Sequence, residues 1–226
     1  MWWFILDYWE SFVAFCAFGL FHSITAREPF KNTLARWTTP RFVDQYWRLL
    51  YCVISFFCYF QIIALHWRSH PANNAWLIEY PDWAWQIITA IHLGSIGMFY
   101  AAVVQCDYLE FLGLKQAWRS VLAAFGRPEP RLALKQFGTR TLEVQGIYGW
   151  VRHPMYVSGL LYFITSGPTL NTFAFALMYA LYMVIGGHYE DRRLVRIFGD
   201  EYVAYRSRVG AFVPRLRFAQ PVLERN

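Results

Sequence analysis

The sequence predicts an all-α, polytopic membrane protein with about five transmembrane helices, the last two forming a helical hairpin. An interfacial helix and a cytoplasmic C-terminal helix are expected beside them. The composition supports this fold class, since 57% of the 226 residues are hydrophobic, 20% aromatic and only 16% charged. Soluble domains carry about a quarter charged residues. In addition, the charged residues fall between apolar runs whose lengths suit a bilayer crossing.

Three apolar segments account for the first part of the chain. Residues 11–26, 49–67 and 83–106 contain no Asp, Glu, Lys or Arg. A transmembrane helix needs about 20 such residues, and the second and third segments reach about that length. The first segment is shorter, so we expect its helix to begin earlier, with Asp7 and Glu10 near its outer end.

The longest uncharged run predicts a helical hairpin. Residues 154–189 form 36 positions without Asp, Glu, Lys or Arg. A single helix of that length would measure about 54 Å, well beyond a hydrocarbon core of about 30 Å. Gly167-Pro168 marks the turn, which gives arms at 155–166 and 170–188. The first arm is short, so its turn is expected within the bilayer, shielded by protein.

The remaining segments complete a single membrane domain. Residues 107–125 mix apolar and basic side chains and predict an interfacial helix, and 126–138 reads as a loop. The four cysteines include no CxxC pair, so neither a disulfide framework nor a metal site is expected. The expected parts are three helices in 1–106, the interfacial helix and loop in 107–139, the hairpin region in 140–214 and a tail in 215–226.

The basic residues predict an orientation. The net charge is +6, but Lys and Arg alternate with apolar spans and form no single patch, so a nucleic-acid partner is not expected. They gather after the first and third segments and in the tail. By the positive-inside rule these parts face the cytoplasm and the N-terminus lies outside. We expect an integral protein of the bacterial inner membrane, with the bilayer as partner and the oligomeric state open.

Polar clusters at both ends of the hairpin predict a binding site. Arg152-His153 precedes it and His188, Glu190 and Asp191 follow it, and both arms return to the same face. Ionisable groups at such a boundary are costly, which favours a function. A plainer alternative is that the arginines extend to lipid headgroups and pair with the acids.

The aromatic residues around these clusters favour a charged ligand. Tyr148, Trp150 and Tyr156 surround Arg152-His153. Guanidinium groups suit a carboxylate, carboxylates accept hydrogen bonds from hydroxyls or amines, and aromatic faces attract a cationic centre. S-adenosylmethionine carries all of these groups. The chain has no GxGxxG segment, so a Rossmann-type site for it is not expected.

Two motifs resemble one family of membrane enzymes. RTLEVQGIYGWVRHPMYVSG at 140–159 and EDRRLVRIFGDEYVAYRSRVGAFVP at 190–214 are similar to the cofactor region of the isoprenylcysteine carboxyl methyltransferase family. FHSITAREPFK at 21–31, FLGLKQAW at 111–118 and GPTLN at 167–171 resemble the branch that S-methylates small thiols such as methanethiol.

The resemblance implies a cofactor, S-adenosylmethionine, bound from the cytoplasmic side, with a small or lipophilic acceptor. A strand-like lead-in would line the adenosine, and Arg152 would support the pocket or bind the cofactor carboxylate. The cofactor-binding residues that the resemblance implies are Thr141, Leu142, Glu143, Tyr148, His153, Pro154, Met155, Tyr156 and Glu190. One departure from the prenylcysteine enzymes is Gly186 in place of their arginine, which makes a carboxylate-bearing acceptor less expected.

A thiol acceptor requires its thiolate, so a base or cation beside it would assist. We predict His188, Arg152 and His22 as catalytic candidates, the last if the first helix packs against the hairpin. A histidine that only satisfies a backbone carbonyl is the alternative.

Other functions remain open at this point. Within the same class, the acceptor could be a prenylcysteine carboxylate or a phospholipid amine. A haem-binding membrane protein or isomerase is a second class, because His22, His66, His92 and His188 lie near predicted helices. A nicotinamide-dependent reductase and a protein that only binds or supports are further alternatives.

Overall fold

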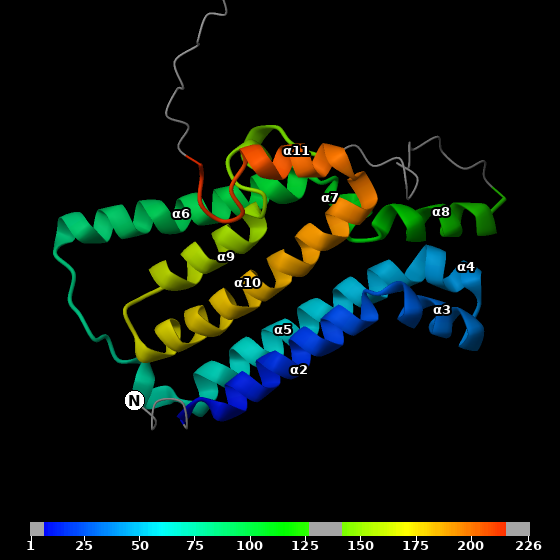
Figure 1. Ribbon diagram of the computed structural model, residues 1–226. Helices are drawn as coiled ribbons and strands as arrows, with labels where there is room; N and C mark the ends of the chain where they lie inside the picture. Colours follow the sequence, from blue (N-terminus) through cyan, green and yellow to red (C-terminus); the bar gives the residue numbers. More distant parts are fainter. Residues whose placement is uncertain (1–6, 127–141, 216–226) are drawn as a thin grey trace, which may run out of the picture.

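The computed structural model describes residues 7–126 and 142–215, and these form an all-helical bundle (Figure 1). No β-strand forms in the described residues, only two isolated bridges, Trp76–Thr169 and Val151–Gly210. The helical fold class is therefore confirmed. The principal helices are α2 (Trp9–Thr25), α3 (Glu28–Trp37), α4 (Pro40–Phe42), α5 (Arg48–Ser69), α6 (Asp82–Gln105), α7 (Tyr108–Phe111), α8 (Leu114–Ala124), α9 (Pro154–Thr165), α10 (Leu170–Phe198) and α11 (Asp200–Arg208).

Three helices of the described chain are long and apolar enough to cross a membrane. They are the continuous segment Pro40–Ser69, which joins α4 to α5 through the π-helical turn Val43–Trp47, then α6, and then α10. α2 has 17 residues and α9 has 12. At about 1.5 Å per residue, α9 measures only about 18 Å. All five predicted segments are thus helical, and three of them have crossing length.

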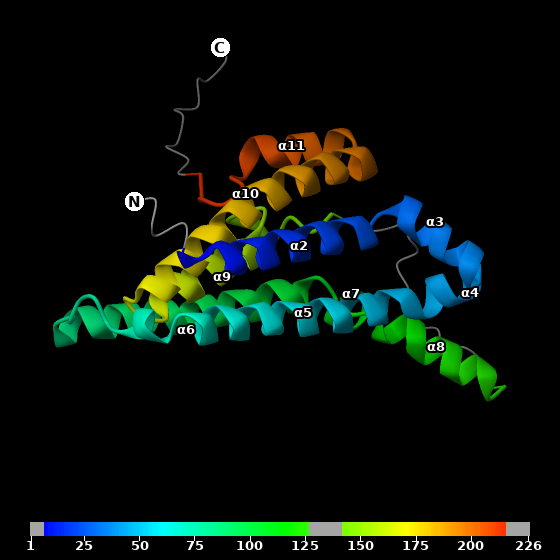
Figure 2. The same cartoon turned by 90° about the horizontal axis from the view of Figure 1, so that it is seen from below.

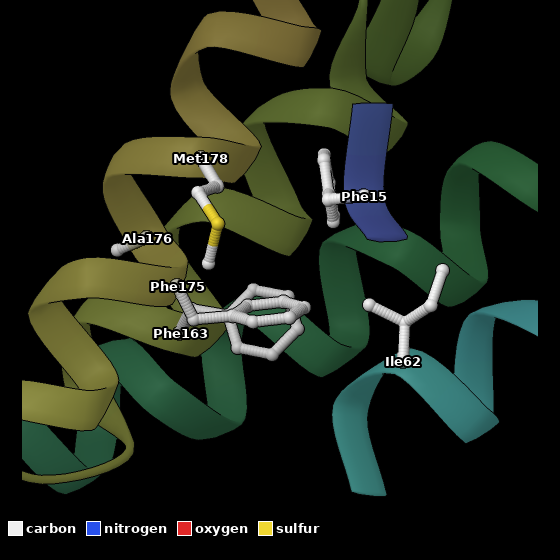
Figure 3. Close-up of a cluster of buried hydrophobic side chains, with 6 residues drawn as sticks. All are labelled: Phe15, Ile62, Phe163, Phe175, Ala176 and Met178. Atoms are coloured by element: carbon white, nitrogen blue, oxygen red, sulfur yellow. The ribbon is translucent and has the colours of Figure 1, made fainter. Parts of the chain in front are cut away.

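The helices pack as neighbouring pairs. α6 lies along α9, α9 packs on α10, and α2 lies along α5, while α10 also contacts α2 and α5 (Figures 1 and 2). A cluster of buried side chains, which we call the aromatic core, fills the space where α2, α5, α9 and α10 meet (Figure 3). Its members are Phe15, Ile62, Phe163, Phe175, Ala176 and Met178.

A buried polar network, which we call the asparagine network, joins helix ends at one end of the bundle. Asn171, at the start of α10, is completely buried. Its Nδ2 donates to the carbonyl of His70 and to Oδ1 of Asn74, both at 2.8 Å, and its Oδ1 accepts from the Tyr8 hydroxyl at 2.6 Å. These bonds tie α10 to the start of α2 and to the 3-10 turn Pro71–Asn74, the latter following α5.

Three of the four residues between α9 and α10 are covered by another part of the chain. Gly167, Pro168 and Thr169 are buried. The Leu77 amide donates to the Pro168 carbonyl at 2.9 Å, and Trp76 bridges to Thr169. Protein groups therefore satisfy the backbone at this turn.

Two predicted boundaries were wrong. The interfacial segment 107–125 is divided into α7 and α8, because Gly113 adopts φ +81° and a Cβ there would lie 2.6 Å from the Leu49 backbone nitrogen. α10 does not end at His188 but continues to Phe198, so the acids Glu190 and Asp191 are helical. The predicted loop 126–138 and tail 215–226 fall almost wholly outside the described residues.

Candidate functional site

The carboxylate of Asp191 is the central acceptor of the polar cluster where α9 begins. Arg152 binds it through Nε at 3.3 Å and through a terminal guanidinium nitrogen at 2.5 Å. His153 Nε2 lies 3.0 Å from it, and the Tyr202 hydroxyl donates to it. The Arg152 and Asp191 side chains are only 7% and 15% exposed, so this ion pair is largely shielded from water. Asp191 is thus saturated by protein donors.

Arg152 and His153 also hold the segment that follows α11. A guanidinium nitrogen of Arg152 donates to the Val209 carbonyl at 2.6 Å. The backbone amides of Arg152 and His153 donate to the carbonyls of Gly210 and Ala211, at 2.8 and 3.1 Å. Segment 209–211 therefore docks against the start of α9.

Close packing at Gly187 completes this arrangement. A Cβ on Gly187 would lie 2.6 Å from the Phe212 ring and 3.4 Å from His153 Cδ2. The ring centroids of His153 and Phe212 are 5.5 Å apart. A larger residue here would require the Phe212 ring to shift, so glycine favours the close approach that lets Asp191, one turn on, reach His153.

The charge state of His153 follows from its surroundings. Burial by itself would lower its pKa, but the hydrogen bonds and negative charges of Asp191 and Glu190 raise the pKa to about 9. The imidazolium form is therefore the stable one at neutral pH, and it offers donors to both acids.

This raised pKa predicts a pH-dependent stability. The folded pKa exceeds the ordinary value of about 6.5, so the contribution of His153 is complete below about pH 6.5 and is lost as pH rises through about 9. We expect the melting temperature of the detergent-purified protein to fall between pH 6.5 and 9.5. A His153→Gln variant should melt lower at pH 6.5 and show a smaller fall. Equal falls in both proteins would contradict this assignment.

Glu190 differs from its neighbour because part of its carboxylate stays open. Its side chain is 44% exposed, and Oε2 lies 3.6 Å from His153 Nδ1. The hydroxyl of Tyr156 approaches the same carboxylate, and the negative charge of Glu190 also acts on the buried Tyr148. A cation or hydroxyl donor arriving at this end of the bundle would therefore meet an available carboxylate beside aromatic rings.

A groove of about 570 Å³ is lined by residues of the lead-in to α9, of α11 and of the segment after α11. The residues that line the groove are Val144, Gly149, Trp150, Tyr205, Arg208, Val209, Pro214 and Arg215. The Tyr205 hydroxyl donates to the Tyr148 carbonyl at 2.6 Å and fixes one wall of the groove. Its volume lies within the range of small-molecule sites.

The structure brings most of the sequence-predicted binding residues to one end of the bundle. Tyr148, His153 and Pro154 are buried, whereas Met155 and Tyr156 are half-buried in the first turn of α9. Leu142 and Glu143 are half-buried in an irregular segment, so no strand forms there. Thr141 lies outside the described residues.

The two catalytic histidine candidates lie in different surroundings. His22, in α2, lies 2.8 Å from the Tyr51 hydroxyl and 3.1 Å from Ser55 Oγ, both in α5. Tyr51 in turn lies within electrostatic range of Arg193 in α10. His188 is exposed beside Tyr189, outside the Asp191 cluster. The catalytic roles of both histidines and of Arg152 stay predictions.

Sequence reasoning missed Tyr202, which completes the cluster. Its side chain is 1% exposed and reaches Asp191 from α11. The paired tyrosines 202 and 205 in the second motif were a signal, because buried tyrosines need hydrogen-bond partners. In residues 7–126 and 142–215, no group of three or more His, Cys, Asp or Glu side chains could hold a metal ion.

Comparisons with known proteins agree with the motifs. Methanethiol S-methyltransferase 1 of Bradyrhizobium diazoefficiens is 29% identical over 203 residues, which are 87% of this chain and 63% of that protein. Methanethiol S-methyltransferase of Pseudomonas deceptionensis is 30% identical over 202 residues, 88% of this chain and 70% of that protein. This chain thus spans less than two thirds of the Bradyrhizobium relative and somewhat more of the Pseudomonas one.

A more distant relative matches about half of the chain. Protein-S-isoprenylcysteine O-methyltransferase of Schizosaccharomyces pombe is 32% identical over 124 residues, 51% of this chain and 52% of that protein. These relatives confirm the resemblance drawn from the motifs. No solved structure matches the chain. The profile described as NnrU protein matches residues 12–193, well over half of the sequence, and the chain therefore belongs to the NnrU family.

Proposed function

We propose that this protein is a membrane-embedded methyltransferase that moves a methyl group from S-adenosylmethionine to a small thiol of the methanethiol type. The relatives that match nearly nine tenths of the chain carry that name. The structural observation that carries the proposal is the meeting of two motifs, in which His153 and Asp191, 38 residues apart, lie 3.0 Å from each other. Their contact leaves Glu190 open beside Tyr156.

The residues present fit the cofactor by their donor and acceptor chemistry. When bound, S-adenosylmethionine supplies an electrophilic methyl carbon on a cationic sulfur. Glu190 would accept hydrogen bonds from its hydroxyl or ammonium groups, and the rings of Tyr148 and Tyr156, which lie near this carboxylate, would suit its cationic sulfur. The groove beside Trp150 and Tyr205 has room for the adenosine. Arg152 acts as a positioning residue, because its donors already hold Asp191 and Val209.

The reaction needs little more than alignment and a deprotonated acceptor. The acceptor sulfur loses its proton to a base or to water, and it then forms a bond to the methyl carbon. A bound S-adenosylmethionine would supply this methyl carbon and would keep the electron pair of the broken carbon–sulfur bond on its own sulfur. Positioning supplies most of the rate in such a transfer. His22, held by Tyr51 and Ser55, and the exposed His188 are the candidate proton acceptors.

The proposal includes a topology. α2, α5 and α6 cross the bilayer, and α9 and α10 form the terminal hairpin, in the bacterial inner membrane. α3, α8 and α11 gather at the end of the bundle that holds the Asp191 cluster (Figure 1). Their arginines and lysines support a cytoplasmic location for this end and an outer N-terminus.

A prenylcysteine acceptor is a weaker candidate. At Gly186, where the prenylcysteine enzymes place arginine, a Cβ would lie 3.0 Å from the Tyr156 hydroxyl. A side chain there would require the Tyr156 ring to shift by a few tenths of an ångström, and with glycine the site offers no carboxylate-binding guanidinium at that position.

Calorimetric binding of S-adenosylmethionine to the detergent-purified protein tests the proposal. Glu190→Gln removes the open charge, and we expect its Kd to rise at least about tenfold, since a hydrogen bond to a charged group contributes about 1.5–3 kcal/mol. Glu201→Gln, an exposed acid on α11, is the matched control and should bind normally. A well-folded wild-type protein that binds no S-adenosylmethionine would overturn the proposal.

A further inference from the structure

The interface between α9 and α10 contains two reciprocal contacts of tyrosine with glycine. A Cβ on Gly159 of α9 would overlap the hydroxyl of Tyr179 from α10. In the other direction, a Cβ on Gly186 of α10 would lie 3.0 Å from the hydroxyl of Tyr156 from α9. The two helices thus exchange tyrosine side chains across their contact.

A third contact extends this set toward α2. A Cβ on Gly19 would lie 3.4 Å from the ring of Tyr182, whose centroid is 6.2 Å from that of Tyr156. Tyr59, in α5, lies within electrostatic range of both Tyr179 and Tyr182. We call Tyr59, Tyr179 and Tyr182 the tyrosine wall. Because Tyr182 is also within electrostatic range of Glu190, the wall begins next to the proposed cofactor site.

The hydroxyls of the tyrosine wall lack protein partners. Among the described residues, Tyr59, Tyr179 and Tyr182 make no hydrogen bond through their hydroxyl groups. All three side chains are largely covered by neighbouring helices. Each of these hydroxyl oxygens keeps some accessible surface, since none of them is a fully buried polar atom without a partner. Three accessible donors close together can therefore donate hydrogen bonds to an anionic or polar ligand between them.

The tyrosine wall packs directly against the aromatic core. The ring centroids of Tyr179 and Phe163 are 5.5 Å apart, and those of Phe163 and Phe175 are 4.6 Å apart (Figure 3). Phe175 is completely buried. A ligand that enters past Tyr182 meets this floor, and a close-packed core has no room for a long chain.

We propose that the tyrosine wall is the acceptor subsite, where its hydroxyls donate hydrogen bonds to the thiolate sulfur and the aromatic core limits the acceptor to short alkyl thiols. This inference rests on the proposed methyltransferase function. The tyrosines keep their protons throughout, since the thiol proton passes to the base or to water. Bond making and breaking occur only between the thiolate sulfur, the methyl carbon and the cofactor sulfur.

Removal of single hydroxyls tests the first half of the proposal. Tyr179→Phe and Tyr59→Phe are to be compared with Tyr100→Phe, a tyrosine of α6 that is 70% exposed. The KM for methanethiol at saturating S-adenosylmethionine should rise about fivefold in each wall variant, which corresponds to about 1 kcal/mol per hydrogen bond. The Kd for S-adenosylmethionine and the KM of the control should stay unchanged.

A smaller side chain in the aromatic core tests the second half of the proposal, the limit on the length of the acceptor. Rates are to be measured for methanethiol, ethanethiol, propanethiol and butanethiol. The wild type should lose activity as the chain lengthens, and Phe163→Val should shift the preference toward propanethiol and butanethiol. Met178→Ala opens the same core and serves if the first variant fails to fold. An unchanged length profile in a folded floor variant would overturn the limit set by the core.

The outcomes separate this inference from the function on which it rests. A wild-type protein that neither binds S-adenosylmethionine nor methylates a thiol removes the proposed function. A wild-type protein that does both, with wall variants that behave like Tyr100→Phe, leaves the function in place and shows that the acceptor binds elsewhere.

Discussion

Replacing Asp191 with asparagine is expected to destabilise the protein by about 3 kcal/mol, because the change leaves the shielded charge of Arg152 without a counter-ion. The carboxylate also accepts from His153 and Tyr202, and asparagine provides one acceptor oxygen where the carboxylate provides two. The docking of segment 209–211 depends on the same arginine. We therefore expect the end of the chain to become more accessible as the melting temperature falls.

Thermal melting in detergent, together with limited proteolysis near α11, measures this effect. Asp200→Asn is the matched control, because Asp200 is an exposed acid in the first turn of α11, the next helix along the chain. The control should melt within a degree or two of the wild type. If Asp191→Asn melted at the same temperature as this control, the Asp191 cluster would not stabilise the protein as its geometry indicates.

Replacing Asn171 with leucine is expected to have an effect of similar size at the opposite end of the bundle. The change removes three hydrogen bonds of a fully buried side chain, one to the buried Tyr8 hydroxyl and two part-buried ones to His70 and Asn74. The buried Tyr8 hydroxyl left unsatisfied costs about 1–3 kcal/mol, and the two part-buried bonds add to this loss. The melting temperature should fall strongly, whereas the Kd for S-adenosylmethionine should not change in the protein that remains folded.

The melting temperature and the Kd for S-adenosylmethionine, measured on the same variant, distinguish an effect on stability from an effect on cofactor binding. Asn32→Leu, at an exposed position of α3, serves as the control and should alter neither measurement. A large change in cofactor affinity in Asn171→Leu would mean that the two ends of the bundle are coupled, which the present arrangement does not require.

The apolar helices were predictable because a bilayer crossing has a signature in composition and length. Segments 49–67 and 83–106 match α5 and α6 to within two residues at each end. The end of α10 was not predictable in this way. Its last turns carry Glu190 to Arg193, which read as a helix end, although an α-helix carries charged residues readily once it leaves the apolar phase.

The proximity of the two clusters was also predictable, since a hairpin returns to the face where it began. The different roles of Glu190 and Asp191 were not. Neighbouring residues on a helix point about 100° apart. Asp191 therefore faces Arg152 and Tyr202, and Glu190 faces the open side near Tyr156. Only the rotation of α10, which Gly187 permits, decides which acid is saturated.

The docking of segment 209–211 on Arg152 has a consequence for the order in which the protein is made. Arg152 emerges from the ribosome 57 residues before Val209, whose carbonyl it binds. Until that late segment is released, the guanidinium, the imidazole of His153 and the buried start of α9 lack their final partners. The cluster therefore assembles after α10 has been inserted, and a chain cut short within α11 would carry every predicted transmembrane segment and still have an incomplete site.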